Sequence, residues 1–270
     1  SNLIFIHLYT HSITTINRIK TITMKILLQK NEFLEKLELA SRFTSSRLAS
    51  STSLQGVCLK GDNNIIHFYS TDLNYYYHSF LKIENNNKFK IIIEPKKIIE
   101  FLSLLPEIKI EMEIKEKAIV ISQGKIKGQF PLFSDQEFPF PPEKTGEKQK
   151  IKTSFFKESL PFLLFAASTD ETRPVLTGIN FVTNDDELQL VTTDGFRLSL
   201  LTLEKDLPFS SMIIPAGFLA NTQRFINKET EIEFSYLNSE KLLAFFIGDN
   251  NIYVRMIEGE YPPFEKVIPV

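Results

Sequence analysis

Leu54-Gln55-Gly56-Val57 and Leu176-Thr177-Gly178-Ile179 are two versions of one pattern, and they lie 122 residues apart. Thr71-Asp72 recurs at the same spacing as Thr193-Asp194. A repeat of this length, with strand and helix patterns in each copy, limits the architecture before any catalytic motif is considered. The chain is predicted to be a tandem of two copies of one domain.

Further positions extend the repeat at almost the same spacing. Phe33 falls on Phe155 without a gap. The stretches Asp135-Gln136-Glu137-Phe138-Pro139 and Glu258-Gly259-Glu260-Tyr261-Pro262 end the two copies alike. The repeat therefore covers whole domains and not only isolated motifs.

The boundaries of the copies divide the 270 residues into three parts. We expect a leader at 1–23, one domain at 24–146 and a second at 147–270, each of ordinary domain size. The leader begins without Met, lacks the features of a secretory signal and matches nothing in the second copy. We therefore take Met24 as the natural start and expect the leader to lie outside the fold.

Composition indicates a soluble globular chain that acts in the cytoplasm. Hydrophobic residues make up 43% of the chain and charged residues 24%, and no apolar run approaches the ~18 residues of a membrane span. Cys58, the single cysteine, has no partner for an internal disulfide, which fits a reducing compartment.

The two copies differ in charge. The net charge is −2, but residues 24–146 carry 17 basic and 15 acidic groups, whereas residues 147–270 carry 12 and 18. A chain with this balance does not coat nucleic acid by charge alone. Contact with DNA would require Lys and Arg placed on one face.

Alternation of apolar and charged residues predicts antiparallel strands. Residues 108–114 alternate in this way, residues 231–236 repeat the pattern, and turn residues separate such stretches at short intervals. Each copy reads as strand, helix, strands, strand, helix, strands. That order suggests a further pseudo-repeat within each copy and an α+β fold, with two helices packed on one side of antiparallel sheet.

Four stretches have helical spacing. Asn31 is predicted to cap a helix that places Phe33, Leu37 and Ala40 on one face, and Pro95 opens a second helix. In the second copy, 154–168 and the stretch after Pro215 take the equivalent places. On this alignment Ala216-Gly217 replaces Lys96-Lys97, and Pro161 lies inside the helix of 154–168, where it is expected to cause a kink.

The usual catalytic signatures are missing from the sequence. We find no phosphate-binding loop, dinucleotide fingerprint or zinc motif, and the histidines at 7, 11, 67 and 78 lack metal-ligand spacing. We interpret these histidines as surface groups and predict no metal and no cofactor.

One acidic cluster supports an alternative function. Asp170, Glu171 and Asp194 lie near Arg173 and Arg197 and are candidates for a metal-dependent hydrolase. The competing interpretation is that these carboxylates are solvated, with Asp194 in a turn before Gly195. We favour the turn.

Two segments resemble one family closely. Ser168–Gly178, which contains Thr-Arg-Pro-Val-Leu, and Val191–Leu198, which contains Thr-Asp-Gly-Phe-Arg-Leu, are similar to the bacterial beta sliding clamp, the processivity subunit of DNA polymerase III. The start Met24-Lys25-Ile26 and the ending Glu258–Pro262 agree, so the resemblance runs over 24–270.

The resemblance implies a DNA-clamp fold and a non-catalytic function. Family members carry three such domains per chain and pair head to tail, so that six domains encircle duplex DNA with helices inside. Such a ring tethers the replicative polymerase and slides because its phosphate contacts are weak and sequence-independent. The implied partners are double-stranded DNA, the polymerase III catalytic subunit, the clamp loader, other proteins with a clamp-binding motif and further copies of the chain, with no membrane.

The length of the chain leaves two forms of ring open. It stops at Val270, where a third domain is expected, and we interpret it as a fragment. The alternative is a two-domain clamp that closes as a trimer, as eukaryotic and archaeal clamps do. In either form, the edge strand around Lys125–Phe130 is expected to pair across the boundary between subunits.

The resemblance also implies two sets of site residues. The partner-peptide pocket would include Leu176, Thr193, Gly195, Phe196, Arg197, Leu198, Pro262, Lys266 and Val267. The DNA-facing residues would be Arg47, Lys96, Lys97, Arg173 and Arg224. For Leu176 and Leu198, ordinary core packing is the competing interpretation. Lys157 is the only base in the first helix of the second copy, so that domain is expected to contribute little to the DNA contact.

Overall fold

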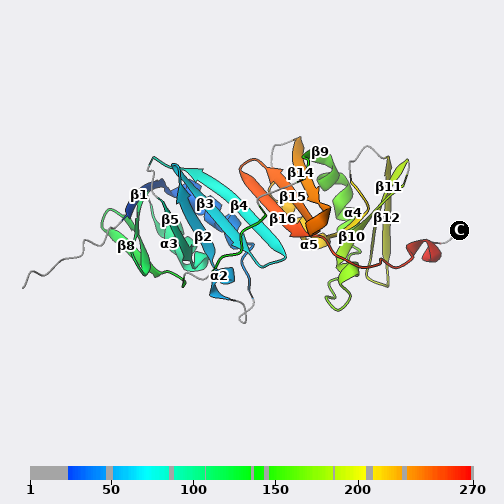
Figure 1. The fold of residues 1–270 in the computed structure, drawn as a ribbon, viewed down its shortest axis with the longest axis horizontal. Coiled ribbons are helices and arrows are strands. Elements are labelled where there is room, and N and C mark those ends of the chain that lie inside the picture. The colour runs from blue at the N-terminus through cyan, green and yellow to red at the C-terminus, as the bar shows by residue number, and fades with distance from the viewer. Residues whose placement is uncertain are drawn as a thin grey trace, which may run out of the picture.

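The computed structural model describes residues 24–46, 51–84, 88–106, 108–134, 137–142, 146–184, 186–204, 209–226 and 230–268. The leader and Arg47 lie outside the described residues. Two units of mixed helix and strand follow one another along the long axis of the molecule (Figure 1). Among the described residues, no helix is long and apolar enough to cross a membrane.

The first unit contains eight strands and three helices within the described residues. They are β1 (Met24–Gln29), α1 (Lys30–Ser41), α2 (Thr52–Gln55), β2 (Val57–Asp62), β3 (Ile65–Thr71), β4 (Tyr75–Lys82), β5 (Phe89–Ile93), α3 (Pro95–Leu104), β6 (Lys109–Ile114), β7 (Ala118–Gln123) and β8 (Ile126–Pro131).

The second unit repeats this order with shorter helices. Its described elements are β9 (Gln149–Lys152), the π-helix η1 (Phe155–Ser159), α4 (Leu160–Leu164), the 3₁₀ helix η2 (Pro174–Thr177), β10 (Gly178–Thr183), β11 (Glu187–Thr193), β12 (Leu198–Glu204), β13 (Met212–Pro215), α5 (Ala216–Gln223), β14 (Glu231–Leu237), the 3₁₀ helix η3 (Asn238–Glu240), β15 (Leu242–Ile247), β16 (Asn250–Arg255) and the 3₁₀ helix η4 (Phe264–Val267).

The strands form three antiparallel sheets. Two have four strands, in the orders β1-β6-β7-β8 and β12-β11-β10-β13, and the third has eight, in the order β5-β2-β3-β4-β16-β15-β14-β9. Each unit contributes four strands to the large sheet, and the two sets meet where β4 pairs with β16. The α+β class, the antiparallel sheets and the pseudo-repeat within each copy are confirmed.

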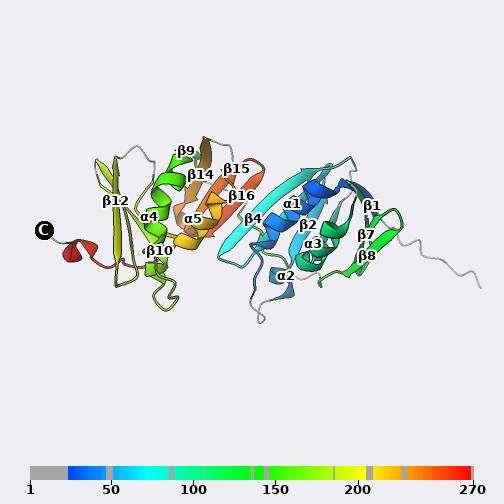
Figure 2. The same cartoon turned by 180° about the vertical axis from the view of Figure 1, so that it is seen from behind.

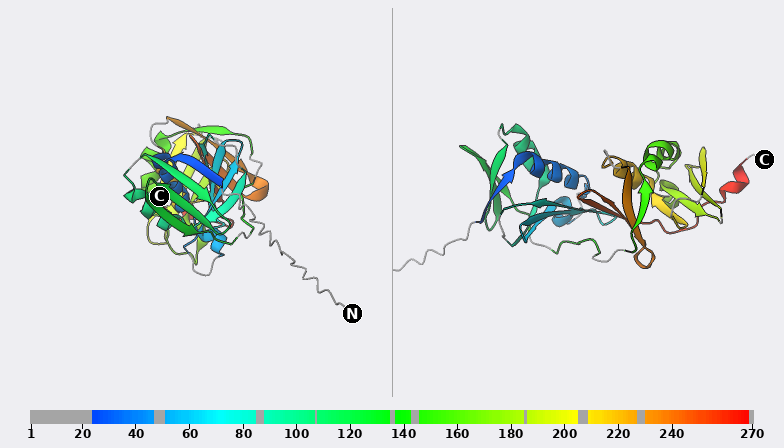
Figure 3. Two further views of the ribbon diagram at one scale, coloured as in Figure 1. Left: turned by 90° about the vertical axis from the view of Figure 1, so that its left-hand side faces the viewer. Right: turned by 90° about the horizontal axis from the view of Figure 1, so that it is seen from above.

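The helices pack on one side of the sheets because their apolar stripes face that way. Phe33, Leu37 and Ala40 of α1 are buried in the core. Figure 2 shows α1, α3, α4 and α5 on the near side of the strands, and the view from above in Figure 3 shows α1, α3 and α4 along one side of the molecule. The predicted cap is wrong: α1 begins at Lys30, and Gln29 precedes it without a side-chain cap hydrogen bond.

The first helix of the second copy changes its hydrogen-bond pattern just before Pro161, whereas the predicted kink stays a prediction. The backbone N–H of Leu160 donates to the carbonyl of Phe155, five residues earlier, and α4 continues for only one turn. Proline has no N–H to donate and its ring crowds the preceding turn. A π-turn before the proline accommodates both effects.

The two copies align only with single-residue gaps, which corrects the gap-free spacing. Leu28 and Ile151 occupy the same register against β6 and β14, and they are 123 residues apart. Phe33 therefore corresponds to Phe156 and not to Phe155. Both Phe33 and Phe156 are fully buried.

At the second helix of each copy, the spacing between the copies is one residue shorter than 122 instead of one longer. β5 and β13 take the same register against β2 and β10 when they are offset by 121 residues. Lys96 and Lys97 therefore correspond to Gly217 and Phe218, not to Ala216 and Gly217. The second copy has an aromatic side chain where the first has a lysine.

The domain junction is the contact between the two copies around β4 and β16. The ring of Tyr75 stacks on Phe218 at 5.9 Å. Phe225 lies 5.9 Å from Phe43 and 6.0 Å from Tyr77 between ring centres. The Tyr77 hydroxyl also donates to Oδ1 of Asn250 at 2.7 Å. Strand pairing and aromatic packing together connect the two units.

Candidate functional site

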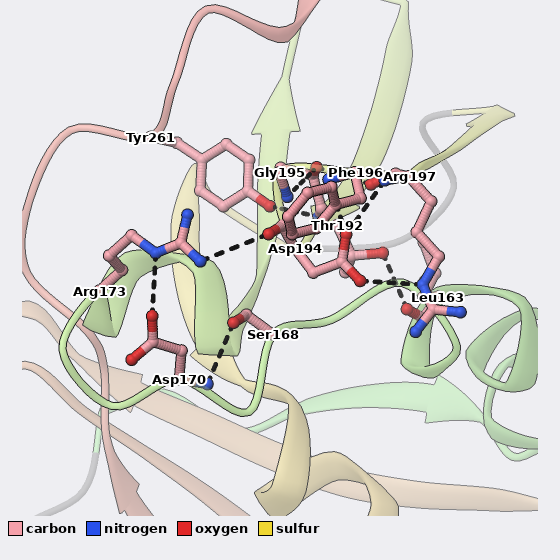
Figure 4. Close-up of polar contacts among 11 residues, drawn as sticks. Leu163, Ser168, Asp170, Arg173, Thr192, Asp194, Gly195, Phe196, Arg197 and Tyr261 are labelled. Atoms are coloured by element: carbon pink, nitrogen blue, oxygen red, sulfur yellow. Dashed lines mark hydrogen bonds and ion pairs between the residues drawn. The ribbon is translucent and has the colours of Figure 1, made fainter.

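A tight turn connects β11 to β12, and we call residues 193–198 the pocket turn (Figure 4). Thr193 Oγ1 accepts from the N–H of Gly195 at 3.0 Å and donates to the carbonyl of Arg197 at 2.6 Å. Asp194 Oδ1 accepts from the N–H groups of Phe196 and Arg197 at 2.9 and 3.0 Å. Gly195 has φ 93°, which glycine adopts without strain. Two short polar side chains thus fix the backbone.

The first copy builds the same turn between β3 and β4. Thr71 Oγ1 donates to the carbonyl of Tyr75 at 2.6 Å, and Asp72 Oδ1 accepts from the N–H groups of Asn74 and Tyr75 at 2.9 and 2.8 Å. Leu73 takes the left-handed conformation with φ 77°. The recurring Thr-Asp pair therefore has a local cause, because both turns require the same hydrogen bonds.

The pocket turn presents an aromatic ring and a cation. Phe196 is 97% exposed. Nε of Arg197 lies 2.9 Å from Oδ2 of Asp194, and its guanidinium carbon lies 4.8 Å from the ring centre of Phe165. Phe165 is itself 58% exposed. Apolar and cationic groups that face solvent side by side are typical of a surface that binds a partner.

Tyr261 connects the pocket turn to the C-terminal segment, which we define as residues 257–268. Its hydroxyl accepts from the N–H of Thr193 at 3.0 Å. Burial raises the pKa of Tyr261 to about 12, so the hydroxyl stays protonated at neutral pH. The sequence placed Tyr261 only in a repeated ending. Its equivalent Phe138 has no hydroxyl, and this difference is the signal that marks Tyr261.

The remaining pocket candidates lie around this turn with different exposure. Leu176 is in η2 and only 5% exposed, and its carbonyl accepts from the N–H of Ser168 at 2.9 Å. Leu198 is half-buried at the start of β12, whereas Pro262 and Lys266 are exposed. The side chain of Val267 lies outside the described residues. The burial of Leu176 is what core packing requires.

A groove of about 640 Å³ lies under the C-terminal segment, beside the pocket turn but separate from it. Its lining includes Asn180, Met212, Lys241, Glu258 and Pro262. Neither Leu176 nor any residue of the pocket turn lines this groove. Pro262 is the candidate pocket residue that borders it.

Arg173 lies at the base of the pocket turn. Its Nε is 3.1 Å from Oδ2 of Asp170, and its guanidinium donates to the carbonyl of Asp194 at 3.5 Å (Figure 4). The side chain is therefore engaged in a bridge between two loops of the second copy. Asp170 is also bonded to the backbone N–H and hydroxyl of Thr172.

The other basic candidates lie on the helices. Lys96 and Lys97 are exposed in the first turn of α3, and Nζ of Lys97 is 3.1 Å from the carboxylate of Glu94. Arg224 is exposed at the end of α5. These three residues belong to the helices that line one side of the sheets.

The acidic cluster has a structural role in these loops. A hydrogen bond from the Thr172 hydroxyl holds the pKa of Asp170 below its usual range, and the N–H of Phe196 does the same for Asp194. Both carboxylates are therefore ionised acceptors that organise turns. No group of three or more His, Cys, Asp or Glu side chains in the described part of the chain is arranged to hold a metal. The geometry favours the turn interpretation of Asp194.

Comparison with known proteins agrees with this architecture. The model for the N-terminal domain of the DNA polymerase III beta subunit matches residues 24–142, and the model for its central domain matches 150–263. The chain is 30% identical to the beta sliding clamp of Streptococcus pneumoniae strain R6 over 264 residues, covering 90% of this chain and 67% of that protein. The chain belongs to the beta sliding clamp family. The beta sliding clamp of Bacillus subtilis is 26% identical, with 91% and 68% covered.

Solved structures of the family have the same fold. The DNA polymerase III beta chain of S. pneumoniae TIGR4 superimposes with a TM-score of 0.82 at 26% identity and covers 91% of this chain and 68% of its own. The clamp of Bartonella birtlesii, solved bound to griselimycin, gives 0.81 at 24% identity, with 92% and 68% covered. The chain spans about two thirds of the length of these relatives. The DNA-clamp fold and the function of a replication sliding clamp are confirmed.

Proposed function

We propose that this chain forms part of a ring around duplex DNA, with α1, α3, α4 and α5 facing the DNA, and that it tethers the polymerase without catalysing a reaction. Family membership and the arrangement of the helices on one side of the sheets support this proposal. The proposed partners are duplex DNA, the polymerase III catalytic subunit, the clamp loader and other proteins that carry a clamp-binding motif, all in the cytoplasm.

The proposed DNA contacts are weak and depend on charge. Lys96, Lys97 and Arg224 are exposed on the helical side, with Arg173 as a more constrained neighbour and Arg47 as a further candidate. Phosphate contacts of this kind release counterions, so affinity falls steeply with salt.

A double variant in α3 measures how much this helix contributes to DNA binding. Replacing Lys96 and Lys97 by Ala should reduce the slope of log affinity against log salt by roughly 1 for each phosphate that is no longer neutralised. Lys148→Ala is the matched control, because Lys148 pairs at 2.8 Å with Glu233 on the opposite face of the sheet. Equal slopes for the double variant and the wild type would rule out a phosphate contact by α3.

The proposed peptide surface includes Phe196, Arg197 and Leu198 of the pocket turn, with Pro262, Lys266 and Val267 on the C-terminal segment and Leu176 beneath. The 97% exposure of Phe196 is the observation that carries this assignment. Phe196→Ala should weaken binding of a polymerase clamp-binding peptide by about 1–3 kcal/mol. Phe162→Ala, which removes another exposed ring, is the control. Equal affinity in wild type and Phe196→Ala would exclude Phe196 from the surface.

The ring is proposed to close through β8 and β12. β8 takes the place in its sheet that β16 takes in the second copy, and β12 takes the place of β4. β4 and β16 pair with each other at the domain junction. By this equivalence, β8 fits a partner strand of the β4 type and β12 fits a partner strand of the β16 type.

The side chains do not suit a direct contact between β12 of one copy and β8 of the next. Arg197 and Lys97 take the places of the stacked Tyr75 and Phe218, so that two cations replace an aromatic pair. A pairing with like charges in place of ring contacts is unfavourable.

The hydrogen bond at the junction has no counterpart in such a contact either. In place of Tyr77 and Asn250, which form it, the equivalent positions hold Ser199 and Ile126, and that pair cannot form it. The geometry therefore disfavours a trimer of this chain. It favours a ring in which β8 and β12 each contact a different partner surface.

Light scattering of the 270-residue chain at micromolar concentration separates the two forms of ring. We expect no stable trimer. A stable trimer would reject the unequal-edge argument and support the two-domain clamp. The DNA and peptide measurements above do not depend on this outcome.

A further inference from the structure

The first copy has a pocket of about 520 Å³ beside the turn that corresponds to the pocket turn. Its lining includes Leu54, Leu73, Glu137, Phe138, Pro139 and Phe140. Leu54 corresponds to Leu176, because the carbonyl of each accepts a hydrogen bond from a serine N–H, at 2.7 and 2.9 Å respectively. Pro139 corresponds to Pro262 in the repeated ending. The pocket is therefore the counterpart of the peptide surface proposed for the second copy.

Leu73 has a conformation that is unusual for leucine. Its φ of 77° lies in the left-handed region, and Gly195 takes the same place in the second copy with φ 93°. A Cβ makes this conformation unfavourable, whereas glycine adopts it without strain. Burial does not compensate, because Leu73 is 46% exposed. The first copy thus keeps an apolar side chain beside the pocket at a cost in stability.

Two aromatic rings of the segment 137–142 form a fixed wall of the pocket. Phe138 is buried, and its ring centre lies 5.3 Å from that of Phe140. Phe140 also packs edge-on against Tyr69, with ring centres 4.9 Å apart, yet it is 41% exposed. Large apolar side chains that face solvent around one pocket are typical of a surface that binds a partner. A wall that is already in place lowers the entropy cost of binding.

We propose that this pocket binds a short peptide, which places one large apolar side chain against Leu73 and Phe140 and a lysine or arginine next to Glu137. The proposal rests in part on the peptide surface proposed for the second copy. Glu137 is the one charged side chain among the described residues that line the pocket. Lys60 and Lys90 do not line it, and each lies 5.9 Å from the ring centre of Phe140. Because Glu137 is three residues away along the segment, the cation of the peptide fits at that end.

The two copies would select different peptides. Both have a glutamate at the same place of the repeated ending, Glu137 in the first copy and Glu260 in the second. The second copy adds the cation of Arg197, whereas the first has Tyr75 in its place, and that ring stacks on Phe218 at the domain junction. A basic peptide therefore suits the first copy better than the second.

Fluorescence anisotropy with a labelled Lys-Lys-Leu-Phe-Gly peptide tests the pocket. Leu73→Gly is the decisive variant, because glycine suits the backbone but removes the apolar side chain. We expect the affinity to fall at least about fivefold in Leu73→Gly and in Phe140→Ala. The midpoint of thermal unfolding of Leu73→Gly should be equal to or above that of the wild type. Glu137→Gln should weaken binding of this peptide several-fold and leave binding of Ala-Ala-Leu-Phe-Gly unchanged.

Phe196→Ala is the control, because it removes an exposed ring from the pocket turn of the second copy and should leave the affinity for the basic peptide unchanged. Three results would overturn the proposal: no binding to the wild type at millimolar peptide, wild-type affinity in both Leu73→Gly and Phe140→Ala, or a loss of affinity in Phe196→Ala. Failure of the second-copy surface is separate, since it appears as unchanged binding of the polymerase clamp-binding peptide in Phe196→Ala.

Discussion

Acidification from pH 7 to pH 5 should destabilise the protein through His78. Burial lowers the pKa of this residue in the folded chain from 6.5 to about 4. A lowered folded pKa means that the unfolded chain binds the proton more tightly. Neutral His78 therefore leaves the folded state at its full stability above pH 6.5. The free energy of unfolding decreases as the pH falls from 6.5 towards 4.

The size of the effect follows from these two values. Between pH 7 and pH 5 the unfolded histidine becomes almost fully charged while the folded one remains neutral. Integration over this interval gives a loss of about 2 kcal/mol, and the complete shift corresponds to about 3 kcal/mol. His67 contributes in the same direction because its pKa is also lowered by burial. Carboxylates contribute little here, since most of them titrate below pH 5.

Urea unfolding at pH 7 and pH 5 measures this dependence. The difference between the two pH values should be smaller by about 2 kcal/mol in His78→Gln than in the wild type. The comparison uses the pH dependence and not the absolute stability, so any general cost of the substitution cancels. Equal pH dependence in both proteins would refute the assignment of a neutral, buried His78.

Substitutions at Tyr261, Gly178 and Asp194, with Tyr236 as a control position, test the loops and the core. Tyr261→Phe should lower the unfolding free energy by ~1 kcal/mol and speed hydrogen exchange at the pocket turn, whereas Tyr236→Phe, which loses a 2.8 Å bond to another hydroxyl, should leave the turn protected. Gly178→Ala should lower the free energy of unfolding by about 1–3 kcal/mol, because the added Cβ would lie 2.4 Å from Ile213. Thermal unfolding measures the change. Unchanged stability would show that β13 can move away from the new methyl group without cost. Asp194→Asn should retain peptide binding and Asp194→Ala should lose it, measured by fluorescence anisotropy, since only Asn keeps the acceptor for the turn; a nuclease activity lost in both would revive the hydrolase alternative.

The sequence was sufficient for the order and type of most elements. Alternation over 108–114 predicted β6, and the spacing of Phe33, Leu37 and Ala40 predicted the buried face of α1. The turn interpretation of Asp194 also agrees with its hydrogen bonds. These features depend on neighbours within a few residues, which is the range that periodicity and turn chemistry describe.

Long-range register was less accessible from the sequence. The spacing of 122 residues fits the motifs but misplaces Phe33 by one residue and Lys97 by another. His67 and His78 appeared isolated because their spacing has no metal signature, yet the β3–β4 pairing brings them together. A strand pair joins residues by register, and a shift of one residue moves a side chain to the other face.

The two copies are most alike where the backbone demands it. A Cβ added at Gly56 or at Gly178 would lie less than 2.6 Å from an isoleucine side chain of the neighbouring strand. Gly124 and Gly248 both have positive φ. Residues of this kind are set by local geometry, so they recur whatever the domain binds.

The copies differ where their side chains face something outside the domain. Tyr75 in the first copy stacks on the second domain, whereas Arg197 in the same place of the second copy pairs with Asp194 and covers Phe165. Phe218 closes the junction, whereas Lys97 in its place remains exposed on α3. The same backbone thus carries different side chains at equivalent positions of the two copies. The positions where the copies differ identify the surfaces that a partner must match.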